Sequence, residues 1–197
     1  MARSEIKRLF ALFIVILLSL GLYAQGQQPS HLKFLDIPIT GNYQTMIQKL
    51  KTKGFVWDKT GARGFQMHGR FSGRTAILQV FFTPKTKIVW QVDVYFDKAD
   101  WRELSMQYDE YKKTLIKKYG NPESHYEEFE WPYTEDDGMQ DVAIREGKCN
   151  YSSYFDVPNG LISLEIAKSN RLQITYEDAV NREIKRKEVE QEQMDDL

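Results

Sequence analysis

Residues 74–96, RTAILQVFFTPKTKIVWQVDVYF, contain two runs of alternating side chains joined by a short turn at residues 84–86. One side of the first run is apolar and consists of Ala76, Leu78, Val80 and Phe82. The matching side of the second run consists of Ile88, Trp90, Val92, Val94 and Phe96. Side chains that alternate with a period of two lie on opposite faces of a strand. The stretch therefore predicts an antiparallel hairpin that is buried on one face only.

Similar alternation on either side of this hairpin predicts further strands. It occurs at residues 65–71, 149–155, 162–166 and 172–176, and residues 55–58 predict a shorter strand. Residues 31–39 alternate weakly and end at a proline and a glycine, which predicts an edge strand or an extended lead-in.

Two stretches have helical spacing instead. The first carries apolar residues at positions 43, 46, 47 and 50, with Asn42 as a cap and Gly54 after its end. The second starts at Asp100, has Glu103 at the capping-box spacing, and stops at residues 120–122.

This order of elements predicts an α+β protein. The expected arrangement is one antiparallel sheet with helices packed on one face, built from two tandem helix-plus-strands units at about residues 31–97 and 98–178. Residues 123–147 mix aromatic and acidic side chains and predict a long, partly ordered insertion. Residues 179–197 are dense in charge and predict a solvated helical tail.

The first 24 residues have the features of a signal peptide. Arg3, Lys7 and Arg8 precede an apolar run at residues 9–22, and Ala24 precedes the expected cleavage site. The apolar run is shorter than the roughly 20 residues that cross a bilayer as a helix. We therefore expect export to the periplasm or secretion, with membrane attachment only through an uncleaved leader.

The composition of the remaining chain argues against several classes of protein. Without residues 1–24 it carries 24 basic and 27 acidic side chains, which does not resemble a nucleic-acid-binding protein. Cys149 is the one cysteine in the sequence, so a disulfide-stabilised scaffold is excluded. The simplest role for Cys149 is that of a small buried apolar residue.

The sequence contains no motif for a catalytic, cofactor or metal site. GxGxxG, GxSxG, HExxH, CxxC and a phosphate-binding loop are all absent, and His31, His68 and His125 are scattered. The acidic pair Asp136 and Asp137 lacks the ligand spacing of a calcium loop. We predict no cofactor, no metal and no catalytic residue.

The polar face of the sheet is the main candidate binding surface. The residues expected on it are Gln66, His68, Arg70, Gln79, Phe81, Gln91, Asp93, Tyr95, Tyr154, Glu165 and Gln173. Aromatic and arginine side chains among polar groups favour the binding of an envelope protein or a glycan. The alternative is that this face carries such residues only because half of a two-layer sheet faces water.

Aromatic residues in the predicted insertion form a second candidate. They are Tyr126, Phe129, Trp131 and Tyr133. They either bind a partner, with Trp131 and Tyr133 as the contact residues, or pack over one end of the sheet.

Several short segments resemble a group of small exported proteins of Gram-negative bacteria that have no assigned function. They are HLKFLDIPI at 31–39, KGF at 53–55, KYGNP at 118–122 and the final DDL. The tandem helix-plus-sheet order is also similar to β-lactamase-inhibitor-protein-like modules. Both resemblances imply an exported α+β protein, and neither implies a catalytic residue.

From these observations we expect an exported, non-catalytic binding module. One alternative is a small periplasmic hydrolase that uses His68 with Asp93 or Glu165. Another is a structural envelope component whose charged tail docks elsewhere.

Overall fold

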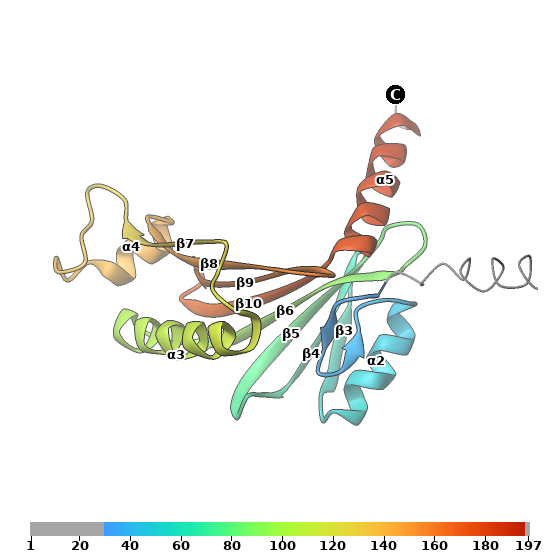
Figure 1. Cartoon of the computed structure of the whole chain (residues 1–197), viewed down its shortest axis with the longest axis horizontal. Coiled ribbons are helices and arrows are strands. Elements are labelled where there is room, and N and C mark those ends of the chain that lie inside the picture. Colours follow the sequence, from blue (N-terminus) through green and yellow to red (C-terminus); the bar gives the residue numbers. More distant parts are fainter. Residues whose placement is uncertain (1–29, 196–197) are drawn as a thin grey trace, which may run out of the picture. The chain divides into compact units, whose positions relative to one another are not determined.

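A computed structural model describes residues 30–195 of the chain, of which those from His31 onward form one compact unit (Figure 1). The predicted signal peptide lies outside the described residues. The helices are α2 (Tyr43–Thr52), α3 (Trp101–Tyr119), α4 (Gln140–Glu146) and α5 (Ala179–Asp195). The strands are β1 (Lys33–Phe34), β2 (Ile37–Pro38), β3 (Val56–Thr60), β4 (Gly64–Phe71), β5 (Arg74–Phe82), β6 (Val89–Lys98), β7 (Ser124–Phe129), β8 (Cys149–Val157), β9 (Gly160–Ala167) and β10 (Arg171–Asp178).

Eight of these strands form one antiparallel sheet in the order β3-β4-β5-β6-β10-β9-β8-β7. Each half follows a helix: α2 precedes β3 to β6, and α3 precedes β7 to β10. The halves join where β6 pairs with β10, for example at Val94 opposite Ile174. The predicted α+β class, with an antiparallel sheet and tandem helix-plus-strands order, is confirmed.

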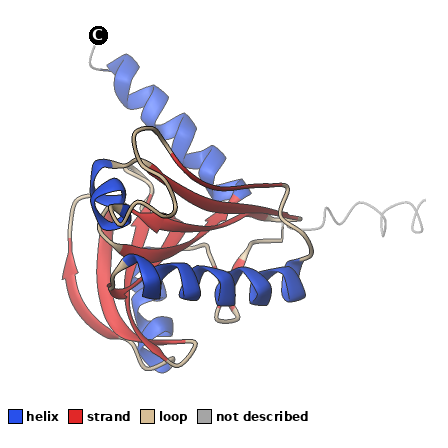
Figure 2. Cartoon of the chain, turned by 90° about the vertical axis from the view of Figure 1, so that its left-hand side faces the viewer, coloured by secondary structure: helices blue, strands red, loops and turns tan. Residues whose placement is uncertain are grey.

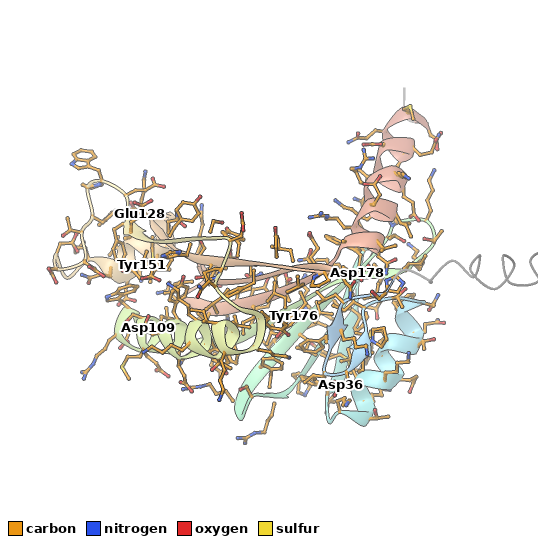
Figure 3. All side chains as sticks on the ribbon, in the orientation of Figure 1. Asp36, Asp109, Glu128, Tyr151, Tyr176 and Asp178 are labelled. Carbon is orange, nitrogen blue, oxygen red and sulfur yellow. The ribbon has the colours of Figure 1, made fainter. Side chains whose placement is uncertain are left out.

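The core lies between this sheet and the helices α2 and α3. Met46, Leu50 and Leu104 are buried there against the apolar sides of the strands. Tyr108 of α3 also reaches the sheet, where its hydroxyl lies 2.6 Å from Ser153 Oγ of β8. In Figure 3, Tyr151 and Tyr176 lie on the side of the sheet that faces α3.

Both predicted helix caps are present. The Asn42 side chain accepts a hydrogen bond from the Gln44 amide at 2.9 Å. The Asp100 carboxylate accepts one from the Glu103 amide, also at 2.9 Å. These bonds satisfy amides that have no partner within the helix, which explains why the helices begin at these positions.

The central hairpin differs from its prediction at one point. Phe81 pairs with Gln91, but Phe82 pairs with Val89, so Trp90 is an extra residue in a β-bulge. The bulge turns Val89 into the core and leaves Trp90 half-buried outside it. The prediction that Ile88 and Trp90 belong to the buried side is therefore wrong.

The prediction that residues 123–147 form a long insertion is wrong for two segments. Residues 124–129 form the edge strand β7, which pairs with β8 from Ser124 opposite Tyr154 to Phe129 opposite Cys149. Residues 140–146 form α4, whose Ala143 and Ile144 are buried. The second half of the sheet therefore has four strands, one more than the sequence predicts.

The N-terminal segment also differs from expectation. Residues 33–38 form a separate two-stranded sheet, and not an edge strand of the main sheet. Phe34, Ile37 and Ile39 from this segment are nevertheless buried in the core. The segment therefore covers one side of the core.

The helix α5 leaves the sheet on the side opposite α2 and α3 (Figure 1). Figure 2 shows the two long helices on opposite sides of the strands. Residues 179–195 of the charged tail form α5, which contacts β6, β9 and β10. No helix among residues 30–195 is long and apolar enough to cross a membrane.

Candidate binding face

The side of the sheet that faces away from α2 and α3 is called the open face below. Strand pairing aligns its side chains in rows across the sheet. One row runs Gln66, Gln79, Asp93, Thr175, Ser163 and Tyr154. The next row runs His68, Ile77, Tyr95, Gln173, Glu165 and Ser152.

Asp93 lies at the centre of a hydrogen-bond network on this face. It accepts hydrogen bonds from Gln91 Nε2 at 2.7 Å and from Thr175 Oγ1 at 3.0 Å. It also accepts bonds from the Tyr95 hydroxyl at 3.2 Å and Gln173 Nε2 at 3.3 Å. Only 3% of Asp93 is exposed, although it points away from the main core. Four neutral donors thus hold a nearly buried carboxylate in one orientation.

Burial raises the pKa of two carboxyls on the open face. The pKa of Asp93 lies above its usual value because burial disfavours the charged form, an effect that its hydrogen bonds only partly offset. The pKa of Glu165 is raised by burial and, to a smaller degree, by the charge of Asp93. Among residues 30–195 neither carboxylate forms an ion pair. When these two carboxyls are ionised, their charge has no matching cation among the described residues.

Glu165→Gln should stabilise the protein at neutral pH by about 0.5–1 kcal/mol, the range typical of removing an unfavourable surface charge. A carboxyl whose pKa is higher in the folded state contributes stability at low pH, and this stability is lost as pH rises above the unfolded value near 4.5. The glutamine side chain does not titrate, so the variant should not lose stability in this way as pH rises. Urea unfolding between pH 4 and pH 8 measures the difference.

The matched control for that measurement is Asp156→Asn, because Asp156 is an exposed carboxylate on the same face. It should leave the pH dependence nearly unchanged. Equal pH profiles for the Glu165 variant and the unchanged protein would contradict the role given to Glu165.

The predicted binding residues of this face do not all lie together. Gln91 and Tyr95 contact Asp93 and are half-buried, whereas Gln79 is exposed beside them. His68 and Arg70 are exposed on β4, near the edge of the sheet, and Arg70 donates a hydrogen bond to the Gly73 carbonyl.

Phe81 lies toward the α5 end of the open face. Its ring centroid is 6.1 Å from that of Trp90, and Lys185 Nζ of α5 lies 5.3 Å from the Trp90 ring centroid. Trp90 and Lys185 are missing from the sequence-based set. The bulge and the position of α5 bring them here, and neither feature can be recognised from local alternation.

The two predicted residues beyond the sheet have different environments. Trp131 is 87% exposed, while Tyr133 is half-buried and donates a hydrogen bond from its hydroxyl to Glu146 at 2.8 Å. Phe129 packs against Trp101, with ring centroids 5.0 Å apart. Phe129 therefore packs against the fold, which is the second of the two roles considered for these aromatic residues. Trp131 remains free for contact with a partner.

The row order separates the groups that a hydrolase would need. His68 and Glu165 lie in one row but are four strands apart, which corresponds to about 19 Å at the usual strand spacing. His68 is two strands from Asp93, or about 10 Å across the sheet. Catalytic groups need hydrogen-bond distances, directly or through one water, so the pairs considered from the sequence are too distant for direct cooperation.

A cavity of about 230 Å³ lies at the β8–β9 part of the open face. Its lining includes Glu165, Tyr154, Ser152, Lys168 and Cys149, but neither His68 nor Asp93. Burial raises the pKa of the Cys149 thiol to about 12, so the thiol is protonated and a poor nucleophile at neutral pH. Within residues 30–195, no three histidine, cysteine or acidic side chains are grouped to hold a metal ion.

Comparisons with protein-family models, curated proteins and solved structures found no match for this chain.

Proposed function

We propose that this protein is an exported binding module that holds a protein partner on the open face and has no catalytic activity. The observation that carries the proposal is the network around Asp93, a nearly buried carboxylate with four neutral donors and no cation. A lysine or arginine of a partner that lies over this face would supply the missing charge, and it would act on Asp93 through its electric field because only 3% of that residue is exposed. Export to the periplasm or beyond rests on the sequence of the leader and is part of the same proposal.

The energetics of such a contact favour recognition. A partly desolvated carboxylate in a low-dielectric setting attracts a cation more strongly than an exposed one does. Its orientation is fixed before binding, which lowers the entropic cost of forming the contact. Tyr95, a member of the network, and Phe81, which pairs with Gln91, supply apolar area of the kind that dominates many interfaces.

The separation of His68 from both carboxylates weighs against the hydrolase alternative. The contacts of α5 weigh against a tail that is free to dock elsewhere. Glu188 of α5 accepts hydrogen bonds from the backbone amides of Lys85 at 2.6 Å and Thr86 at 3.2 Å. These bonds fasten the helix to the turn between β5 and β6.

A photo-crosslinking amino acid placed at Gln79 should capture a partner in envelope extracts, because Gln79 is exposed beside the network. The same group at Lys113, exposed on α3, should not capture that partner. Adding Phe81→Ala and Tyr95→Ala to the Gln79 probe should lower the yield at least about tenfold, as loss of central aromatic contacts does. Mass spectrometry of the adducts measures the yields.

Urea unfolding of the double variant must accompany this experiment, since Tyr95 also donates a hydrogen bond to Asp93. Its stability should fall by only about 1–3 kcal/mol. Equal capture from Gln79 and Lys113, or capture that survives the double variant, would refute binding on the open face. Retention on a glycan matrix that the double variant abolishes would instead assign the face to a carbohydrate.

A further inference from the structure

The loop between β7 and α4 presents a second surface, separate from the open face. Trp131 in this loop is 87% exposed, the largest exposed fraction among the large apolar residues of the described chain. It has no hydrogen bond or ring contact within residues 30–195. Both the ring and its indole N–H are therefore available to another molecule.

The backbone on both sides of Trp131 is held in place. The Glu130 amide donates to the Lys148 carbonyl at 2.8 Å, and the Glu130 carboxylate pairs with Lys148 Nζ at 2.8 Å. On the other side, the Tyr133 amide donates to the Glu130 carbonyl at 3.1 Å. The exposed tryptophan thus stands on a short turn that is fixed at both ends.

The rest of the loop is fixed in the same way. Asp137 accepts hydrogen bonds from the amides of Thr134 at 2.8 Å and Met139 at 2.7 Å. The Tyr151 hydroxyl of β8 donates to Glu135 at 2.6 Å. A contact residue on such a preorganised loop loses little conformational entropy on binding. Exposing a large apolar ring on a rigid loop is a pattern typical of an anchor residue.

The charge around Trp131 is mostly negative, although Lys148 pairs with Glu130 and Lys112 pairs with Glu127. Residues 120–144 contain eight acidic side chains and no lysine or arginine: Glu123, Glu127, Glu128, Glu130, Glu135, Asp136, Asp137 and Asp141. Glu128 belongs to β7 and lies at the same end of the unit as α4 (Figure 3). The side-chain carboxylates of Glu128 and Asp136 form no ion pair or hydrogen bond in the described part of the chain. A partner here would meet a negative field before it meets the indole ring.

We infer that Trp131 is the anchor of a docking surface for a basic protein segment, one with an apolar pocket surrounded by lysine or arginine. Indole inserts into the pocket, and the acidic loop pairs with its basic rim. A membrane surface fits less well because bilayers of envelopes carry anionic lipids, which the loop repels. This surface does not depend on the Asp93 network, so failure of either assignment leaves the other standing.

A peptide library displayed on phage and selected against the whole protein tests this inference. The expected peptides carry net positive charge and apolar residues. Trp131→Ala should weaken their binding at least about tenfold, the minimum expected for an anchor residue. Trp57→Ala is the matched control, since Trp57 is also exposed but lies on the opposite edge strand β3, and it should have no effect.

Charge and site are tested separately with the same peptides. The double change Glu128→Gln and Asp136→Asn should slow association several-fold at low salt and reduce its salt dependence. With ¹⁹F-labelled tryptophan, the resonance that disappears in Trp131→Phe should shift when a selected peptide is added.

Four outcomes would overturn the inference. They are a selection without enriched peptides, enrichment of acidic or uncharged peptides, binding that survives Trp131→Ala, and a shift of the Trp131 resonance on phosphatidylglycerol or phosphatidylcholine vesicles instead of on peptide. The last outcome would assign the loop to a membrane surface.

Discussion

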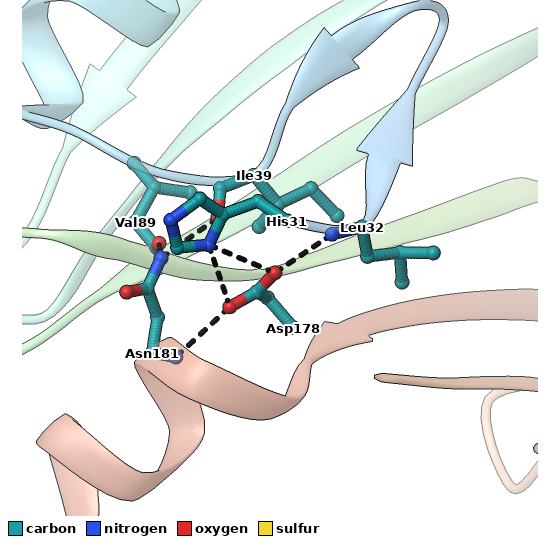
Figure 4. Close-up of polar contacts among 6 residues, drawn as sticks. All are labelled: His31, Leu32, Ile39, Val89, Asp178 and Asn181. Carbon is teal, nitrogen blue, oxygen red and sulfur yellow. Dashed lines mark hydrogen bonds and ion pairs between the residues drawn. The ribbon is translucent and has the colours of Figure 1, made fainter. Parts of the chain in front are cut away.

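Asp178→Ala is expected to lower the free energy of unfolding by about 3–5 kcal/mol, because two buried backbone amides lose their acceptor. Asp178 is fully buried at the end of β10. Its carboxylate accepts hydrogen bonds from the amides of Leu32 at 2.8 Å and Asn181 at 2.9 Å (Figure 4). His31 Nδ1 lies 3.1 Å from the same carboxylate. One side chain thus joins the N-terminal segment to the first turn of α5.

The bond to Asn181 has the spacing of a helix N-cap, and Asn181 extends the network. Its side-chain amide donates to the carbonyls of Ile39 at 2.8 Å and Val89 at 3.0 Å. Loss of Asp178 therefore affects three places together: the N-terminal segment of residues 33–38, the start of β6 and the start of α5. This explains why the expected effect exceeds that of an ordinary cap.

Urea denaturation followed by circular dichroism measures the effect. Asp178→Asn keeps one acceptor oxygen and should lose less stability than the alanine variant. The control Asp156→Ala removes an exposed carboxylate and should change stability by less than about 0.5 kcal/mol. A loss below about 1 kcal/mol for Asp178→Ala would show that the amides find other partners.

Gly160→Ala is expected to destabilise the protein by about 3 kcal/mol, at the upper end for overpacking of a rigid site. A Cβ atom at this position would lie 2.0 Å from the Glu177 carbonyl oxygen and 3.3 Å from the Ala179 amide nitrogen. Both atoms belong to the backbone, so no rotamer change relieves the clash. Gly160 pairs with Asp178 in the β9–β10 ladder. The strain would therefore also distort the hydrogen bonds of Asp178.

Thermal unfolding measures this change, with Gly61→Ala as the control. At Gly61 the nearest atom to an added Cβ is the Gly64 carbonyl oxygen at 3.7 Å, an ordinary contact. The control should therefore shift stability by less than about 1 kcal/mol. Because Gly160 and Asp178 are neighbours, their alanine variants combined should cost less than the two separate losses added together. A melting temperature for Gly160→Ala equal to that of the control would contradict the steric argument.

The parts of the fold that follow from local sequence were predictable. The central hairpin, the caps at Asn42 and Asp100 and the tandem order depend on patterns within a few residues. The strand β7 was missed because SHYEEF has only one residue, Phe129, that contacts the apolar core, so no alternation marks it. Its pairing with β8 comes from backbone hydrogen bonds, which a side-chain pattern does not record.

For the candidate site, the sequence predicts only which face of the sheet carries it, and not which residues are in contact there. Alternation places Asp93 and Glu165 away from the core, but Asp93 is buried because Gln173 and Thr175 reach it from a strand about 80 positions later. The register of β6 against β10 determines that proximity, and local sequence does not contain it. The exposed state of Trp131 likewise depends on the folding of its loop against Lys148 and Tyr151.

The contact between Asp178 and Leu32 also bears on the order in which the unit can assemble. The two residues are 146 positions apart, whereas each half of the sheet is a meander of sequential neighbours. A chain made from its amino end produces residues 31–39 before any strand of the main sheet, yet their polar anchors, Asp178 and Asn181, lie at and after the end of the final strand β10. Contacts between distant parts of a chain form slowly because they require closure of a long loop. The earliest segment of this unit therefore completes its native contacts only after the final strand has joined the sheet.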